Sequence, residues 1–183
     1  IKTENSDSRN VLLSAVYHKN ADFLQYLFGI LPVLGLTQLL AESIDTEHNS
    51  ILHLAISVEC QEILDMVWRE LSSKFDEHRI SSLLVDTNTD NMNAYALLIR
   101  QSKGHAWIKR NFIQKTSPFD LEMVCTSTVG PGVSTIMYAV SQNGLDVATS
   151  LIEQLIAHSP RNIRSTMQKI YMEQYAEIDS ENS

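Results

Sequence analysis

The chain is poor in the residues that mark disulfide-stabilised and membrane-spanning proteins. Its 183 residues include only two cysteines, Cys60 and Cys125, which form no close metal or redox spacing and no disulfide framework. It also lacks an uninterrupted apolar run of about 18 residues, so we expect no membrane insertion. The remaining composition, 44% hydrophobic and 20% charged, predicts one folded, soluble domain (1–183) in a reducing, intracellular compartment.

Cations are scarce as well. The 14 lysines and arginines face 22 aspartates and glutamates, which gives a formal net charge of −8. Because nucleic-acid backbones are bound by clustered cations, this balance argues against a nucleic-acid partner. We interpret the densest basic segment, Lys103 to Lys115, as the solvated face of an amphipathic helix, and we expect Trp107 within it to pack in the core.

Signals for chemistry are few. The run from Asp86 to Asn91 resembles the start of a calcium loop, but Asn91 and Leu97 stand where such a loop needs its glycine and its bidentate glutamate. No two histidines stand at the four-residue spacing of a helical zinc motif. Gly130 and Gly132 flank a proline, which removes an amide that a phosphate cradle would use. The sequence therefore predicts no metal site, no cofactor and no catalytic residues.

What the chain does contain is one pattern that returns four times. It is clearest from Ser50 to Ile56, in the order Ser-Ile-Leu-His-Leu-Ala-Ile. Weaker copies run from Asn10 to Val16 and from Ser134 to Val140, and a degenerate copy runs from Asn93 to Phe112. A self-similar pattern of this kind is the sequence signature of a repeat array.

The repeat has a helical character. The core residues at one register of the pattern, Ala15, Ala55, Leu98 and Ala139, are spaced 40, 43 and 41 residues apart. Apolar residues within a copy recur at three- and four-residue intervals, which predicts a helix-turn-helix with one buried face. In the first copy that face comprises Leu12, Ala15, Val16, Phe23, Leu24, Leu27 and Phe28.

The clearest copy, Ser50-Ile51-Leu52-His53-Leu54-Ala55, resembles the Thr-Pro-Leu-His-x-Ala signature that opens the first helix of an ankyrin repeat. The resemblance covers about four units from Asn10 to Ser159, although none has the family's proline and only the second has its histidine. It implies that helical pairs stack into a solenoid, with hairpin fingers beside a concave face. It also implies that His53 makes local hydrogen bonds and ties adjacent units.

The units are longer than the ankyrin period of about 33 residues. An apolar pair precedes each later core residue by 14 or 15 positions, namely Leu39-Leu40, Leu83-Leu84 and Met123-Val124. We interpret the surplus as a short extra helix or a prolonged second helix. Pro32 and Pro118 fit as breaks, because proline cannot continue an upstream helix.

Polar stretches rich in turn-forming residues follow these pairs. They run from Asp45 to Asn49, from Thr87 to Asn91 and from Thr128 to Gly132, and each is predicted to form a hairpin finger. An amphipathic segment at 160–178 predicts a C-terminal capping helix. The predicted fold class is therefore all-α: an ankyrin-repeat-like solenoid of about four helix-turn-helix units, at 10–43, 49–86, 92–127 and 133–159, with fingers and a cap.

An array of this kind recognises a partner by shape, because its units bury a continuous core while each exposes a first-helix edge and a finger. The resemblance thus implies a monomeric protein-protein interaction module that binds another protein on its concave face and fingers. The predicted first-helix contacts are Tyr17, His18, Ser57, Val58, Gln101, Ser102, Ser141 and Gln142, and the predicted finger contacts are Glu47, His48, Asp90, Asn91 and Pro131.

Two alternatives stay open. In the first, the helical array is an enzyme in which Cys125 or Cys60 pairs with a distant histidine, which requires a cysteine sulfur within hydrogen-bond reach of an imidazole in an open cleft. In the second, exposed apolar edges pair two copies into a self-associating structural scaffold. Light scattering at two protein concentrations separates that scaffold from a monomeric binder.

The long, irregular units, with connectors such as Leu83 to Asp90, also resemble those of ankyrin proteins that intracellular bacteria inject into host cells. That resemblance implies a host protein as partner and the host cytosol as location. A eukaryotic scaffold would have similar units, and its location would be cytoplasmic. Because the chain starts at Ile1 rather than methionine, we expect it to be a piece of a longer protein.

Overall fold

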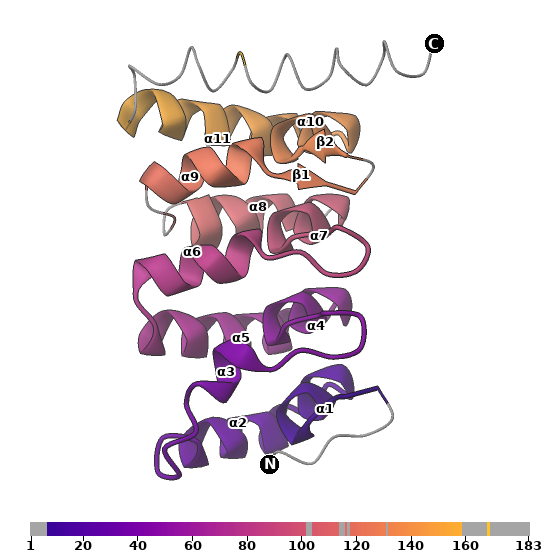
Figure 1. Ribbon diagram of the computed structural model, residues 1–183, viewed down its shortest axis with the longest axis vertical. Coiled ribbons are helices and arrows are strands. Elements are labelled where there is room, and N and C mark those ends of the chain that lie inside the picture. The colour runs from indigo at the N-terminus through magenta and orange to yellow at the C-terminus, as the bar shows by residue number, and fades with distance from the viewer. Residues whose placement is uncertain are drawn as a thin grey trace. The chain divides into compact units, whose positions relative to one another are not determined.

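The computed structural model describes residues 7–101, 104–113, 116, 118–130, 132–158 and 168. The chain divides into two compact units, Ile1–Leu97 and Leu98–Ser183, here called unit 1 and unit 2 and each described by itself. Both units are mostly helical (Figure 1), as the all-α prediction requires. Within the described ranges, no helix combines the length and the apolar character needed to cross a membrane.

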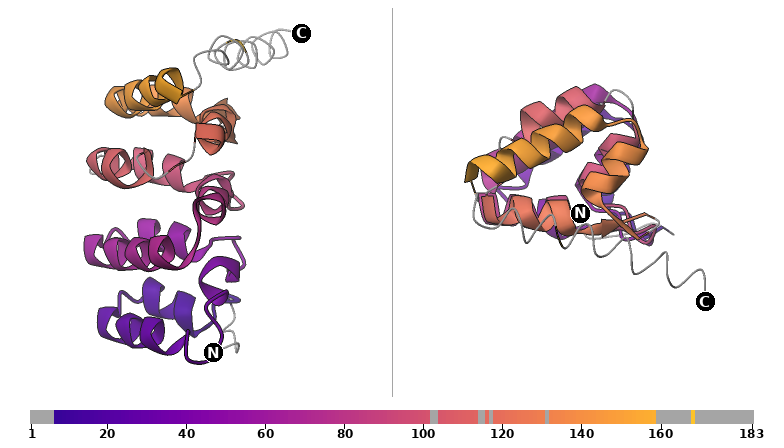
Figure 2. Two further views of the ribbon diagram at one scale, coloured as in Figure 1. Left: turned by 90° about the vertical axis from the view of Figure 1, so that its left-hand side faces the viewer. Right: turned by 90° about the horizontal axis from the view of Figure 1, so that it is seen from above.

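Unit 1 is built from pairs of helices with an additional helix after each pair. Helix α1 packs against α2 and α4, and α5 packs against α4, α2 and α6. The first helices α1 and α4 therefore lie side by side, and so do the second helices α2 and α5 (Figures 1 and 2). The elements in chain order are α1 (Val11–Tyr17), α2 (Ala21–Ile30), α3 (Leu39–Glu42), α4 (Ile51–Ser57), α5 (Gln61–Lys74) and α6 (Glu77–Val85), followed by α7 (Ala94–Arg100), which ends in unit 2.

Unit 2 has the same order of elements and adds one short hairpin. Its elements are α8 (Gly104–Ile108), a π-helical turn η1 (Lys109–Ile113), α9 (Pro118–Thr126), β1 (Thr128–Val129), β2 (Val133–Ser134), α10 (Thr135–Ser141) and α11 (Leu145–His158). The strands are antiparallel, with Thr128 opposite Ser134 and Val129 opposite Val133. Helix α11 packs against α8, η1, α9 and α10. The predicted capping helix at 160–178 lies outside the described residues, except for residue 168.

Each first helix begins at a side-chain cap in the register that the repeat predicts. A serine or asparagine oxygen accepts a hydrogen bond from a backbone amide of the first turn, which satisfies a donor that has no partner inside the helix. At α4 the bonding is reciprocal, because the His53 ring also accepts from the backbone amide of Ser50. The caps are Asn10, Ser50, Asn93 and Ser134.

The turns repeat as faithfully as the helices. Non-glycine residues with positive φ are uncommon, so their recurrence at one register marks a turn that every unit needs. One position lies three residues before each first helix: Ser8, His48, Asn91 and Gly132 have φ of 56°, 57°, 55° and 89°. The other lies two residues before a second helix: Lys19, Glu59 and Asn143 have φ of 55°, 52° and 58°.

The surplus residues of each unit form separate short helices. The three apolar pairs lie in α3, α6 and α9, so the interpretation as an extra helix is confirmed. Pro32 lies in the turn after α2, and Pro118 is the first residue of α9, where its missing amide costs no hydrogen bond. Trp107 is buried, with its ring edge-to-face against Phe112 at 4.9 Å between centroids, as expected of a core residue.

The predicted buried face of the first unit is confirmed with one exception. Phe23 is 39% exposed, whereas Leu24, Leu27 and Phe28 beside it on α2 are buried. Its equivalent one repeat later, Ile63, is fully buried in α5, which packs against α2. The prediction was wrong for Phe23 because burial at this register depends on a preceding second helix, and α2 is the first second helix in the described part of unit 1.

Ser81 stands out among the buried polar residues. It is fully buried in α6, and its hydroxyl is the one buried side-chain polar atom in the described ranges without a hydrogen-bond partner. A buried hydroxyl of this kind retains the cost of its desolvation, about 1–3 kcal/mol.

We expect Ser81→Ala to raise the free energy of unfolding by about 1 kcal/mol more than Ser82→Ala, because only Ser81→Ala removes an unpaired buried hydroxyl. Both substitutions lie in α6, so the gain in helix propensity is the same for each. Urea unfolding followed by circular dichroism measures the difference. Equal effects of the two substitutions would contradict this account.

Candidate functional site

We number each finger by the repeat whose first helix follows it, so the second finger is Asp45 to Asn49, before α4, and the third is Thr87 to Asn91, before α7. A buried carboxylate closes the second finger. Oδ1 of Asp45 accepts hydrogen bonds from the backbone amides of Glu47 (3.0 Å) and Asn49 (2.9 Å), and Oδ2 accepts from the Asn49 side-chain amide (3.3 Å). Arg9 donates to Oδ2 at 3.2 Å and completes an ion pair. Asp45 is only 3% exposed, and a charge buried this deeply must be paired and hydrogen-bonded. The carboxylate therefore fixes the backbone of the finger.

The third finger repeats this bonding with a neutral side chain. Asn88 lies 43 residues after Asp45, and its Oδ1 accepts from the amides of Asp90 (3.1 Å) and Met92 (3.0 Å). Its side-chain amide donates to Asn49 Oδ1 at 2.9 Å. The Thr89 amide also donates to the carbonyl of Glu47 at 2.9 Å. The two fingers are thus joined side by side, and each turns back on itself: Ile44 bridges Ser50, and the Asn88 amide donates to the Met92 carbonyl at 3.2 Å.

His53 joins the first helix α4 to the third finger. Its Nδ1 lies 2.8 Å from Ser50 Oγ and accepts from the Ser50 amide at 3.3 Å. Its Nε2 lies 3.1 Å from the carbonyl oxygen of Met92, which can only accept. The neutral ring protonated on Nε2 satisfies all of these contacts. The local bonds implied by the ankyrin resemblance are therefore present in unit 1.

The His53 ring is 1% exposed, and burial lowers its pKa below the ordinary value of 6.5 because it disfavours the charged form. The hydrogen bond to Met92 and the negative charges of Asp86 and Asp45 act in the opposite direction and are the smaller effects. Protonation of Nδ1 would also break the bond from the Ser50 amide. His53 is thus held neutral as a structural residue.

An aromatic side chain stands exposed at the end of α1. Tyr17 is 47% exposed, and the Arg9 guanidinium lies over its ring at 4.0 Å from the centroid. The His18 ring meets the Tyr17 ring edge-on at 5.3 Å. Because Arg9 also contacts Asp45, one cation links the exposed tyrosine to the second finger. This stacking limits the orientations of the tyrosine.

Eight of the predicted contact residues belong to unit 1, and we call them the finger–helix surface. Six are exposed, and Val58 and Asn91 are half-buried. The bonds between fingers bring the finger members together, Arg9 links the α1 members to them, and α4 packs beside α1. The members are Tyr17, His18, Glu47, His48, Ser57, Val58, Asp90 and Asn91.

The other predicted contacts are not part of this surface. Gln101, Ser141 and Gln142 belong to unit 2, where Gln101 is half-buried and the other two are exposed. Ser141 Oγ donates to the Tyr138 carbonyl at 2.8 Å. Ser102 and Pro131 lie outside the described residues.

Sequence reasoning missed the residues that support the surface. The shared register of Asp45 and Asn88, 43 residues apart in the second and third fingers, could have shown that both close their turns. Nothing in the sequence marked Arg9, because its three acceptors, Asp7, Asp45 and the Tyr17 ring, come together only in the fold.

The two cysteines differ in burial. Cys125 is fully buried in α9, and burial, with a smaller effect of the Glu122 carboxylate, raises its pKa to about 12. Such a thiol is protonated at neutral pH and is a poor nucleophile. Cys60, before α5, is half-buried. Over the ranges that the structure describes, no cluster of three or more His, Cys, Asp and Glu side chains could hold a metal ion.

Comparisons of the chain with protein-family models, with curated proteins and with solved structures found no match.

We expect the free energy of unfolding to decrease as the pH falls from 7 to 5, because His53 binds a proton more weakly in the folded than in the unfolded chain. The neutral His53 ring stabilises the fold fully at pH values above the pKa of His53 in the unfolded chain. This stabilisation is lost as the pH falls toward the lower pKa of His53 in the folded chain. His53→Gln should cost about 1–3 kcal/mol at pH 7 through its lost buried hydrogen bonds, and less at pH 5. Urea unfolding at a series of pH values measures both effects.

The exposed His78 provides the matched control, since His78→Gln removes a solvent-exposed side chain and should change the free energy of unfolding at pH 7 by less than about 0.5 kcal/mol. Asp86 opposes the effect of His53 at lower pH, because burial raises its pKa above 3.8 and its protonation favours the folded chain. A native chain as stable at pH 5 as at pH 7, with an unchanged cost of His53→Gln, would show that the ring is not held neutral.

Proposed function

We propose that this chain is a protein-protein interaction module of ankyrin-repeat type, which binds a partner protein through the finger–helix surface. The fold part of the proposal rests on recurrence: helix pair, extra helix and finger follow one another with the same caps and the same left-handed turn positions. The His53 bond between α4 and the third finger agrees with the ankyrin resemblance of Ser50 to Ala55.

One observation carries the binding proposal. Glu47 and His48 stand exposed on a turn whose backbone is held by the buried Asp45 side chain, and Asp90 stands exposed on a turn held by the Asn88 side chain. Side chains on a pre-ordered backbone lose little entropy when they bind, which favours affinity.

The composition of the surface indicates the kind of partner. Glu47 and Asp90 place negative charge at the finger tips, and the chain as a whole carries a net charge of −8. A partner surface with exposed lysine or arginine residues would therefore be attracted. Tyr17 supplies an aromatic side chain of the type that is enriched among interface hot spots.

The test is affinity capture from a eukaryotic cell lysate, the source that the resemblance to injected bacterial proteins suggests, followed by mass spectrometry. We expect a protein that the native chain retains and that a variant with Tyr17→Ala, His48→Gly and Asp90→Ala loses. Glycine is used at position 48 because His48 has positive φ, which glycine tolerates. Circular dichroism establishes that the variant is folded.

A matched control carries Tyr26→Ala, Gln25→Ala and Glu62→Ala, which remove an aromatic, a polar and an acidic side chain from exposed positions on α2 and α5. The control should retain the captured protein. Equal retention by both variants, or equal loss from both, would contradict binding at the finger–helix surface.

A further inference from the structure

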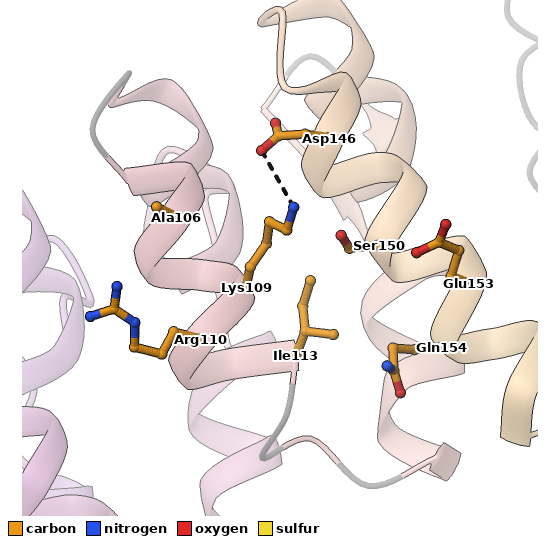
Figure 3. Close-up of a pocket in the computed structure, with 8 residues that line it drawn as sticks. All are labelled: Ala106, Lys109, Arg110, Ile113, Asp146, Ser150, Glu153 and Gln154. Atoms are coloured by element: carbon orange, nitrogen blue, oxygen red, sulfur yellow. Dashed lines mark ion pairs between the residues drawn. The ribbon is translucent and has the colours of Figure 1, made fainter.

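Unit 2 contains a cleft of about 480 Å³ between η1 and α11 (Figure 3). Lys109 and Arg110 line it from η1, and Asp146 and Glu153 line it from α11. Ser150 and Gln154 of α11 also face this cleft, whereas only Ala106 and Ile113 contribute apolar side chains. Both signs of charge thus border one cavity.

The repeat register shows that the cleft has polar residues where unit 1 has a buried methionine. Lys109 and Ser150 lie 43 and 84 residues after Met66, at the same position of the second helix. In unit 1 Met66 is buried, at 9% exposure, in α5, which packs against α2. At the same register of unit 2 both helices carry polar residues, so the two helices are not sealed by apolar side chains.

The π-helical turn explains how the cations come to the surface. Continuing α8 as η1 buries Phe112 and Ile113, and it leaves Lys109 and Arg110 exposed. The contact between Trp107 and Phe112 holds the wide turn on the core. Single π-helical turns are rare and occur frequently at functional sites, which is an observation independent of the cavity itself.

Charge in the cleft is only partly neutralised. Lys109 Nζ lies 3.9 Å from Asp146 Oδ2, and His105 Nδ1 lies 3.4 Å from Asp146 Oδ1. The Lys109 and Asp146 side chains are 45% and 51% exposed, and such exposed pairs contribute little stability and exchange partners readily. Arg110 and Glu153 form no ion pair with the described residues, and Arg110 points away from α11 (Figure 3).

We propose that this cleft is a docking site for a protein segment that carries both an acidic and a basic side chain. The acidic side chain binds Lys109, which exchanges Asp146 for it, and the basic side chain binds Glu153. Two carboxylates in the cleft repel a phosphate or a nucleic acid, and two cations repel a metal ion. The scarcity of apolar lining disfavours an apolar small molecule. This site is separate from the finger–helix surface, and it does not depend on it.

Titration of the ¹⁵N-labelled chain with three synthetic peptides of equal length tests the proposal. One peptide contains glutamate and lysine in equal number, one contains only glutamate as its charged residue, and one contains only lysine. We expect the mixed peptide to shift the amide resonances of Arg110, Ser150 and Glu153 saturably. The uniform peptides should bind about tenfold more weakly, because each loses a charge-assisted contact.

Charge reversal identifies the contact. Lys109→Glu and Glu153→Lys should each weaken binding of the mixed peptide about tenfold or more. Arg100→Glu provides the control, since it also replaces a cation by a glutamate at an exposed position of unit 2 outside the cleft. Absence of saturable shifts, tightest binding of a uniform peptide, or equal weakening by Lys109→Glu and Arg100→Glu would each overturn the proposal.

Discussion

The fingers of unit 1 depend on the hydrogen bonds and the ion pair of the buried Asp45 carboxylate. Burying a carboxylate away from water costs several kcal/mol of free energy unless it is fully paired. Any motion that separates Asp45 from a partner is therefore unfavourable, and the partners stay in place. Those partners are the Arg9 guanidinium, the amides of Glu47 and Asn49, and the Asn49 side chain. Asn49 also accepts from Asn88, so the constraint passes to the next finger.

The residues that support the fold are constant between repeats, and the exposed residues vary. The caps, the left-handed turn positions and the buried apolar residues recur, whereas the exposed side chains differ from unit to unit. Unit 1 uses that freedom to present tyrosine, histidine and acidic side chains on its fingers and first helices. Unit 2 uses it at the second helices, where Lys109 and Ser150 stand at the register of a buried methionine.

The features of the fold that could be predicted from the sequence are those that short stretches of residues determine. The helices, the Ser50 cap and the fingers follow from apolar spacing and turn residues, which act over a few positions. Exposure of Phe23 could not be predicted, because it depends on whether the second helix of an earlier repeat packs against α2. Nor could the cleft beside Lys109, since no residue type marks a π-helical turn. Ser141 was predicted as a contact too, and because it belongs to unit 2 it stays a prediction.

If buried side chains hold the backbone of the unit 1 fingers rigid, the amides bonded within these fingers exchange slowly with solvent. Native-state amide hydrogen exchange measures this directly at Glu47, Asn49 and Thr89, whose amides donate to Asp45 and to the Glu47 carbonyl. We expect these amides to be protected to the same degree as the helical amide of Leu54, which donates to Ser50. Exchange at the rate of an unstructured peptide at all three positions would contradict it.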